Sequence, residues 1–232
     1  MSELLPVVLI PGLLNSARLY AEQLPELWRM GPVTIADHTR DDSIAAIARR
    51  VLATAPPRFA LAGLSMGGYI AFEILRQASE RVARLALLDT SPLPDTAEAS
   101  GARRVQMGLA VDGHFDEVAG GFFQRVVHRS RRTDRALRAL CGLMAEEVGP
   151  AAYVRQQTAI LSRADSRPEL SRIRCPTLVV VGDGDELTPP ERAAEMAQGI
   201  PAARLVTVPN CGHLCTLERP YEVTQALLAW LA

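Results

Sequence analysis

The chain has 232 residues, of which 48% are hydrophobic and 22% charged, and its formal net charge is -1. This length fits one large α/β domain or two small ones, and it allows a buried core without metals or disulfides. The small net charge argues against nucleic acid and anionic membrane surfaces as partners. The apolar run 4–14 contains prolines and follows Glu3 rather than a basic segment, which is not typical of a signal peptide. No stretch approaches the roughly 18 apolar residues of a membrane span. We therefore expect a cytoplasmic protein.

Four cysteines stand at positions 141, 175, 211 and 215. In a chain without a secretion signal, buried thiols are more common than disulfides. Cys211, His213 and Cys215 look like part of a metal site, but a closed zinc site needs a fourth ligand. The sequence has no second cluster of this kind. We expect neither a metal nor another cofactor.

Short apolar runs alternate with amphipathic segments along much of the chain. Each run is too short for a helix and is bounded by Pro, Gly, Asp or Asn, as expected for strands buried on both faces. Alternating strands and helices predict a mostly parallel, doubly wound sheet covered by helices on both sides. The predicted strands are Val7–Ile10, Val33–Ala36, Phe59–Gly63, Ala83–Leu88, Thr177–Val181 and Arg204–Val208. The predicted helices cover residues 42–54, 66–77, 190–198 and 220–231.

The alternation stops between Pro92 and Arg174, where no convincing strand is visible. Ligands of open α/β sheets bind at the carboxyl edge, so an all-helical insertion before the penultimate strand is interpreted as a lid over that edge. A separate helical domain is the alternative. We predict a core of residues 1–91 and 175–232 and a lid of residues 92–174. Predicted lid helices cover 103–111, 115–127, 134–147 and 151–162.

The segment Gly63-Leu64-Ser65-Met66-Gly67 lies between a predicted strand and a predicted helix. A serine hydroxyl is a poor nucleophile unless it is held where a base can remove its proton. A strand that turns sharply into a helix places the serine at the apex, and the glycines make the turn possible. The backbone N–H of Met66, in the first turn of the helix, is free to donate to an anion. The motif alone is weak, but this context makes Ser65 the predicted nucleophile.

Four histidines are candidates for the base. His213 follows the last predicted strand, so it lies at the same sheet edge as the serine, and we select it. His38 begins a polar turn and is expected on the surface. His114 and His128 belong to the helical insertion and are expected to face solvent.

A carboxylate is needed to orient the imidazole and to stabilise its protonated form. It is expected after the strand Thr177–Val181, where Asp183 and Asp185 both fit and Glu186 fits less well. Asp89, at the end of an earlier strand, is a further candidate, although a local role in its own turn is the preferred interpretation. The resulting order of serine, aspartate and histidine is the one found in α/β hydrolases.

Four segments carry a family resemblance: Leu9–Leu14, Leu61–Gly68, Val181–Pro189 and Cys211–Leu214. Through them the chain resembles the α/β-hydrolase superfamily over nearly its whole length. It is similar in particular to small lidded esterases, which include the pimeloyl-carrier-protein methyl ester esterase. The resemblance implies that Asp185 is the acid, three residues after the glycine that ends the strand. It also implies that the N–H of Leu13 joins that of Met66 in an oxyanion hole.

The chain departs from the family pattern in two places. Pro11 stands where a histidine usually precedes the glycine, which removes a backbone donor and a side-chain contact but keeps the N–H of Leu13. We expect the oxyanion hole to survive. The sequence also starts at the first oxyanion strand, without the antiparallel hairpin of many relatives, so we expect about six strands, all parallel.

Ser65 argues against haloalkane dehalogenases and epoxide hydrolases, which resemble this fold but carry aspartate at that position. Leu214 after the base argues against hydrolases of carbon–carbon bonds, which have tryptophan there. We therefore expect a carboxylesterase that cleaves a small or medium ester through an acyl-serine intermediate. A lactonase, an enol-lactonase, a thioesterase or a perhydrolase would share the triad. A non-hydrolytic lyase and a slow-turnover ligand receptor are further alternatives.

Substrate contacts are expected from Leu14, Leu187 and Leu214 beside the triad and from Phe122 and Phe123 in the lid. For the phenylalanines, packing of the lid onto the sheet is an equal alternative. The lid is also locally basic, which suggests a docking surface for an acidic carrier protein or a carboxylate-bearing substrate. A solvated helical face is the favoured interpretation. The residues concerned are Arg125, Arg129, Arg131, Arg132, Arg135 and Arg138.

Overall fold

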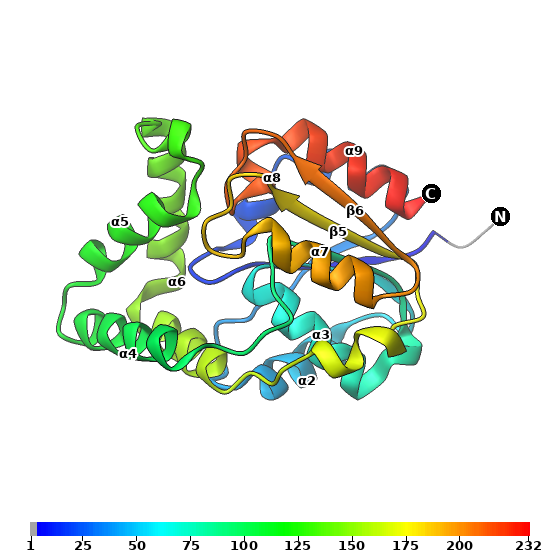
Figure 1. The fold of residues 1–232 in the computed structure, drawn as a ribbon, viewed down its shortest axis with the longest axis horizontal. Helices are drawn as coiled ribbons and strands as arrows, with labels where there is room; N and C mark the ends of the chain where they lie inside the picture. Colours follow the sequence, from blue (N-terminus) through cyan, green and yellow to red (C-terminus); the bar gives the residue numbers. More distant parts are fainter. Residues whose placement is uncertain (1–3) are drawn as a thin grey trace.

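The computed structural model describes residues 4–232, so the first three residues of the predicted core lie outside its described part. Six strands form one parallel sheet in the order β2-β1-β3-β4-β5-β6. Strands β5 and β6 are labelled in Figure 1. The strands are β1 (Val7–Ile10), β2 (Val33–Ile35), β3 (Phe59–Leu64), β4 (Val82–Leu88), β5 (Thr177–Gly182) and β6 (Ala203–Val208). Each pairing is parallel, which confirms the predicted α/β-hydrolase architecture.

The central strands β1, β3 and β5 are buried along their whole length, as their continuous apolar runs predict. The expectation of burial on both faces is wrong for the edge strands β2 and β6, which are mostly half-buried or exposed. An edge strand has one strand neighbour, so part of its surface stays open to solvent.

Helices cover both faces of the sheet. They are α1 (Leu24–Met30), α2 (Ile44–Thr54), α3 (Met66–Ala78), α7 (Pro190–Gly199), α8 (Cys215–Glu218) and α9 (Pro220–Leu231). Because successive side chains of a strand point to opposite faces, Val8 and Ile10 belong to the apolar core on the side of α2, α3 and α7, whereas Val7 and Leu9 belong to the core on the side of α1 and α9. The two layers lie on opposite sides of the sheet in Figure 1. Helices α1 and α8 are not among the helices that the sequence patterns predicted.

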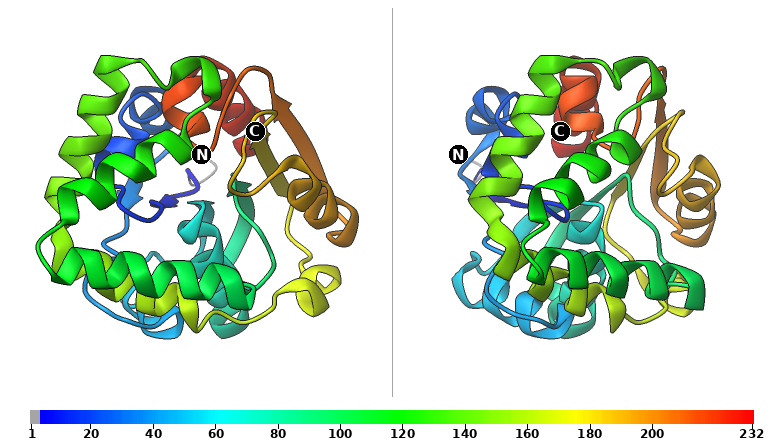
Figure 2. Two further views of the ribbon diagram at one scale, coloured as in Figure 1. Left: turned by 60° about the vertical axis from the view of Figure 1, so that its left-hand side comes forward. Right: turned by 90° about the vertical axis from the view of Figure 1, so that its left-hand side faces the viewer.

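Three further helices lie between β4 and β5. They are α4 (Ala97–Val111), α5 (Phe115–Val126) and α6 (Arg135–Leu161). They pack on one another and stand together beside one edge of the sheet (Figures 1 and 2). Helix α4 starts earlier than predicted, because the side chain of Thr96 accepts a hydrogen bond from the N–H of Ala99 and caps it there.

The two last predicted lid helices are the halves of α6. Gly149 adopts φ 74° and ψ 163°, and Pro150 follows it, so the helix is kinked at this point. Short 3₁₀ turns complete the described chain: η1 (Ala17–Tyr20), η2 (Ser79–Arg81), η3 (Arg129–Arg131) and η4 (Arg167–Arg172). Among residues 4–232, no helix combines the length and apolar character needed to span a membrane.

Candidate active site

Ser65 stands at the sharp turn between β3 and α3. Its backbone has φ 54° and ψ -114°, a conformation that costs energy for any residue with a side chain. The turn is held from the neighbouring strand: the N–H of Ser65 donates to the Leu88 carbonyl at 2.9 Å, and the Thr90 hydroxyl donates to the Ser65 carbonyl at 2.7 Å. The serine is therefore fixed at the carboxyl end of the sheet, as predicted from the motif.

Two glycines of the motif are required by close backbone contacts. A Cβ atom at Gly63 would collide with the backbone of Gly67, and one at Gly67 would collide with the carbonyl oxygen of Ile10 in β1. The strand, the turn and the helix can approach this closely only because neither residue has a side chain.

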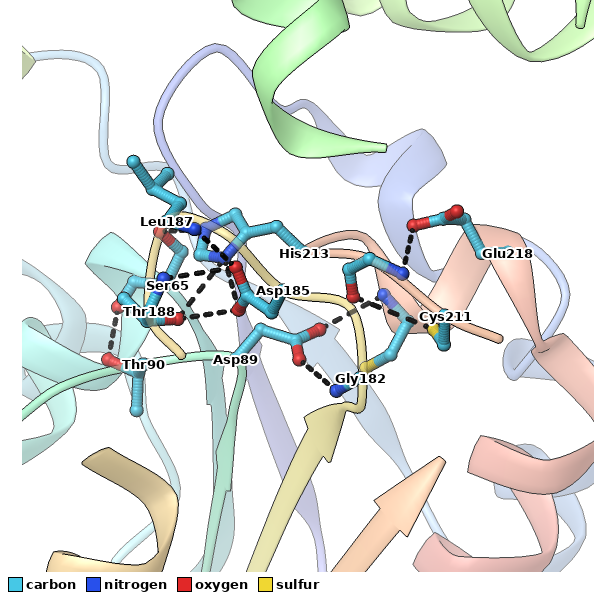
Figure 3. A network of polar contacts seen from close by, with 12 residues as sticks. Ser65, Asp89, Thr90, Gly182, Asp185, Leu187, Thr188, Cys211, His213 and Glu218 are labelled. Carbon is cyan, nitrogen blue, oxygen red and sulfur yellow. Dashed lines mark hydrogen bonds and ion pairs between the residues drawn. The ribbon is translucent and has the colours of Figure 1, made fainter. Parts of the chain in front are cut away.

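His213 lies between Ser65 and Asp185 (Figure 3). Its Nε2 atom is 2.8 Å from the hydroxyl oxygen of Ser65, and its Nδ1 atom is 2.8 Å from Oδ2 of Asp185. Both bonds form together when Nδ1–H donates to the carboxylate and Nε2 accepts the serine proton. The exposed fractions are 7% for Ser65, 1% for His213 and 3% for Asp185. The three side chains form a continuous, buried hydrogen-bonded chain.

The structure distinguishes the candidate acids. Oδ1 of Asp185 accepts the N–H groups of Leu187 and Thr188 at 2.8 and 3.0 Å, and Oδ2 accepts the Thr188 hydroxyl at 2.7 Å. Asp183 is exposed and accepts the N–H of Cys211 instead. Glu186 forms an ion pair with Arg132 at 2.7 Å. Only Asp185 of these three contacts His213.

The electrostatics of the histidine and its acid match this geometry. Burial lowers the pKa of His213, but the Asp185 charge and its hydrogen bond outweigh burial, so the net pKa of His213 is raised. Burial raises the pKa of Asp185, but the His213 charge and the hydrogen bonds from His213 and Thr188 keep the net pKa of Asp185 lowered. The carboxylate is thus ionised and favours a proton on the imidazole.

Asp89 is a further buried carboxyl group, beside Asp185 and His213 (Figure 3). The expectation that it serves its own turn is wrong. Its two oxygens accept the N–H groups of Gly182, at the end of β5, and Cys215, at the start of α8, at 2.9 and 3.0 Å. Burial and the charge of Asp185 raise the pKa of Asp89 to about 7. Asp89 therefore holds together the two segments that carry the acid and the histidine.

The two predicted oxyanion donors stand at the nucleophile. Met66 is the first residue of α3, and Leu13 lines the same cavity as Ser65. Within residues 4–232, neither backbone N–H donates to a protein acceptor, whereas the next N–H, that of Leu14, donates to Oε1 of Gln156 at 3.2 Å. Two free N–H groups beside a serine suit the binding of a negatively charged oxygen.

The expectation that His38 lies on the surface is wrong. Its side chain is buried, with Nε2 at 2.9 Å from the carbonyl oxygen of Gly12 and 3.0 Å from Nε2 of Gln156. Burial lowers its pKa, which favours the neutral ring. The tertiary fold places the histidine against the loop that contains Pro11 and Leu13, although β2 is separated from that loop in sequence.

The expectation for His128 is also wrong, whereas His114 does face solvent and pairs with Glu117 at 2.9 Å. His128 is buried, and its backbone N–H donates to Oε2 of Glu218 at 2.9 Å. Glu218 also accepts the N–H of Gly212 at 2.9 Å. This buried carboxylate, which carried no signal in the sequence, ties the loop of the base to the segment after α5.

A cavity of about 450 Å³ opens at Ser65 between the sheet edge and α4, α5 and α6. Of the predicted contact residues, Phe122 and Leu187 line it. Leu14, Phe123 and Leu214 do not, which corrects the expected set. They surround a separate void of about 10 Å³, and are buried there as packing residues.

All four cysteines are free thiols, with Cys211 and Cys215 buried and Cys141 and Cys175 partly buried. In the described part of the chain, no three His, Cys, Asp or Glu side chains are grouped as a metal site would require. The nitrogen atoms of His213 are instead taken up by the serine and the aspartate.

The fold and this constellation are those of a hydrolase with a serine nucleophile. Residues 7–226 match the model of the alpha/beta hydrolase family, so the chain belongs to this family. It is an enzyme that hydrolyses ester bonds, as its similar relatives indicate.

One similar relative is the pimeloyl-[acyl-carrier protein] methyl ester esterase of Nitrosomonas europaea. It is 30% identical over 87% of this chain and 84% of its own length. Among solved structures, a thermophilic esterase from Thermogutta terrifontis with malate bound has a TM-score of 0.89 and 30% identity, covering 98% of this chain and 89% of that one. The enol-lactonase from Burkholderia xenovorans has a TM-score of 0.88 over 99% and 92% of the two chains, and at 22% identity it supports the fold alone.

Proposed function

We propose that the protein is a carboxylesterase that cleaves a small or medium carboxylic ester through an acyl-serine intermediate. The observation that carries this proposal is the hydrogen-bonded chain from Ser65 through His213 to Asp185, with 2.8 Å at each step. A serine in this geometry gains a base for its proton, and the base gains a carboxylate that stabilises its charged form.

In the first half of the reaction, Nε2 of His213 takes the proton of Ser65 while the serine oxygen bonds to the ester carbon. The carbonyl oxygen becomes an oxyanion, which accepts hydrogen bonds from the N–H groups of Leu13 and Met66. The C–O bond to the alcohol then breaks, and His213 delivers its proton to the leaving oxygen.

In the second half, His213 removes a proton from water, and the hydroxide oxygen bonds to the acyl carbon. The bond to Ser65 breaks, the acid is released, and the serine recovers its proton from His213. Asp185 keeps its charge throughout and holds Nδ1–H of the imidazole.

We also propose that residues 92–174 act as a lid on a core of residues 1–91 and 175–232. The three helices of this segment pack on one another and line the cavity at Ser65. Such a cover excludes water from the reacting ester and selects the substrate by its shape.

A carrier-linked ester is a second candidate substrate, because several relatives are named for a pimeloyl-[acyl-carrier protein] methyl ester. The arginines of the lid are largely engaged within the chain: Arg131 pairs with Asp134 at 2.6 Å, Arg132 with Glu186, and Arg138 stacks on Phe123. These contacts favour a structural role.

Arg129 and Arg135 are exposed and form no ion pair within residues 4–232. They provide the test of carrier docking. If a double variant with glutamate at both positions slows hydrolysis of a carrier-linked ester but not of the free ester, the carrier candidate holds. Equal rates on both substrates would remove it.

The proposed chemistry is tested with Ser65→Ala and a matched control, Ser91→Ala, because Ser91 also lines the cavity. We expect Ser65→Ala to lose a fluorophosphonate label and to reduce kcat on short p-nitrophenyl esters by roughly 10⁴-fold or more, with Ser91→Ala near wild type. Full esterase activity in Ser65→Ala would refute the mechanism. Labelling of the wild type without ester turnover would favour a lyase or a receptor. Values of kcat/KM for a panel of lactones and thioesters, compared with those for esters, show which class of substrate the enzyme prefers.

A further inference from the structure

We propose that the cavity at Ser65 contains a carboxylate-binding subsite formed by Tyr153 and Arg125, with Arg103 behind it. The enzyme would then prefer esters that carry a free carboxylate at a distance from the scissile bond. This inference rests on the proposed esterase function, because it assigns a substrate class to the same cavity.

The charged side chains that line the cavity are strongly biased in sign. They are four arginines and one aspartate: Arg103, Arg125, Arg163, Arg192 and Asp95. Asp95 is shared between two of them, with 2.5 Å to Arg103 and 2.7 Å to Arg163. One carboxylate therefore compensates only one of two largely buried cations, and the cavity wall retains positive charge that favours an anionic ligand.

Arg163 is engaged at all three of its nitrogens, because Nη2 pairs with Asp95 while Nε and Nη1 donate to the carbonyls of Leu93 and Ile160, so we do not assign it to the ligand. Arg103 is connected to Tyr153 by a chain of two hydrogen bonds through Gln157. Its Nη1 donates to Oε1 of Gln157 at 2.8 Å, and Nε2 of Gln157 donates to the hydroxyl oxygen of Tyr153 at 2.7 Å.

The hydroxyl proton of Tyr153 ends this chain without an acceptor. The residue is 2% exposed, and its hydroxyl oxygen accepts from Gln157, yet the O–H has no acceptor within residues 4–232. Buried donors of this kind are nearly always paired, so the missing acceptor points to a ligand. Tyr153 and Gln157 both line the cavity at Ser65.

Arg125 supplies the charge for such a ligand. It lies on α5, three residues after Phe122, lines the same cavity and makes no ion pair within the described chain. Burial raises the pKa of Tyr153, while the charges of Arg103 and Arg125 act in the opposite direction and leave it raised. Both arginines are thus within electrostatic range of this hydroxyl, which keeps its proton for donation.

A carboxylate matches these groups, because it accepts hydrogen bonds from a hydroxyl and from a guanidinium at once. The rest of the lining includes Leu13, Val118 and Phe122, against which a methylene chain can pack. The volume of about 450 Å³ lies in the range of small-molecule sites. The predicted substrate is therefore a carboxyl-bearing aliphatic ester with its ester group at Ser65.

The test compares charged and neutral esters of equal chain length. Monomethyl adipate and monomethyl suberate are compared with methyl hexanoate and methyl octanoate, and 6-acetoxyhexanoic acid with hexyl acetate, so the carboxylate lies on either side of the ester. We expect the wild type to have at least a roughly ten-fold higher kcat/KM for a charged ester in one of these sets. We expect Arg125→Gln and Tyr153→Phe each to remove most of that preference, mainly through KM, and to slow the charged ester more than the neutral one.

The matched control is Arg129→Gln, which removes an exposed arginine that does not line the cavity. It should keep the preference. The proposal is overturned if the wild type shows no preference in any set, or if Arg125→Gln and Tyr153→Phe slow charged and neutral esters equally, as a general structural defect would.

Failure of the subsite is separable from failure of the esterase mechanism. If neutral esters are hydrolysed through Ser65 without charge preference, the mechanism stands and the subsite falls. If no ester is hydrolysed, titration calorimetry of Ser65→Ala with adipate still tests the subsite. Binding that Arg125→Gln weakens roughly ten-fold or more supports it, and no binding overturns it.

Discussion

Gln156 is a single residue that holds the loop of the proposed oxyanion donor Leu13. It comes from α6, yet its Oε1 accepts the N–H of Leu14 at 3.2 Å and its Nε2 lies 3.0 Å from Nε2 of His38. Leu14 has φ 60°, a left-handed conformation that costs a leucine energy. The peptide of Leu13 therefore keeps its orientation because buried partners hold the residues on both sides of it, at Gly12 and Leu14.

We predict that Gln156→Leu lowers kcat by roughly 10- to 100-fold with little change in KM, because an oxyanion donor contributes mainly in the transition state. Gln156→Glu, which keeps an acceptor for Leu14, should retain more activity. Thr158→Ala in the same helix is the control, since its hydroxyl bonds only within α6. Steady-state kinetics on a p-nitrophenyl ester checks this, and an unchanged kcat in Gln156→Leu contradicts it.

The site residues that the sequence predicted lie at the ends of strands, whereas those that it missed bind backbone groups of distant loops. Ser65, His213 and the pair Asp183 and Asp185 each follow a strand, and the carboxyl ends of parallel strands meet at one edge, so local order was enough to bring them together. The family resemblance was needed to choose Asp185. Asp89 and Glu218 act by accepting backbone N–H groups from distant loops, and such partners leave no periodic pattern in the chain.

At the scale of elements, α6 shows how a helix is bent by two residues. Gly149 has a backbone conformation that is nearly restricted to glycine, and no atom lies within 4 Å of the position that its Cβ would take. Gly142 of the same helix has equal free space but ordinary helical backbone angles. Neither position is crowded, so a substitution at Gly149 tests the cost of the backbone conformation alone, and the same substitution at Gly142 is its control.

We predict opposite effects of alanine at the two positions. Gly149→Ala should lower the free energy of unfolding by about 1–3 kcal/mol, because alanine must adopt the strained conformation. Gly142→Ala should raise it by about 0.5–1 kcal/mol through helix propensity. Urea denaturation measures both. A stabilising Gly149→Ala would show that the kink is not imposed by Gly149.

At the scale of the whole molecule, residues 92–174 contact the segment that carries His213 and Glu218 as well as lining the cavity at Ser65. The N–H of His213 donates to the carbonyl of Val126 at the end of α5 at 2.8 Å, and Glu218 holds the next turn, at His128. Burial differs strongly between helices of this segment and of the core. Helix α4 has one buried residue, Ala110, whereas most residues of α3 are buried. We therefore expect α4 to open locally at a lower free-energy cost than α3.

We predict that amides of α4 exchange with solvent faster than those of α3. After Ser65 reacts with a fluorophosphonate, protection should rise in α4 and α5, which line the cavity, and not in α2, which does not contribute to it. Hydrogen exchange followed by mass spectrometry measures both effects. Equal protection in α3 and α4, or a uniform rise after labelling, contradicts the proposed lid.

The sequence by itself determined the parallel sheet and the class of hydrolase, and it predicted the serine, aspartate and histidine that the structure joins by hydrogen bonds. The sheet follows from hydrophobic periodicity, and the common edge of Ser65 and His213 follows from the rule that strand ends collect side chains there. The choice of Asp185 over Asp183 came from the family resemblance. Only the tertiary structure decided that His38 and Gln156 hold the loop around Leu13, that Phe123 and Leu214 are packing residues, and that Arg125 and Tyr153 share the cavity with Ser65. Those contacts join segments far apart in the chain, so they depend on how the helices of residues 92–174 pack on the sheet, which no local pattern encodes.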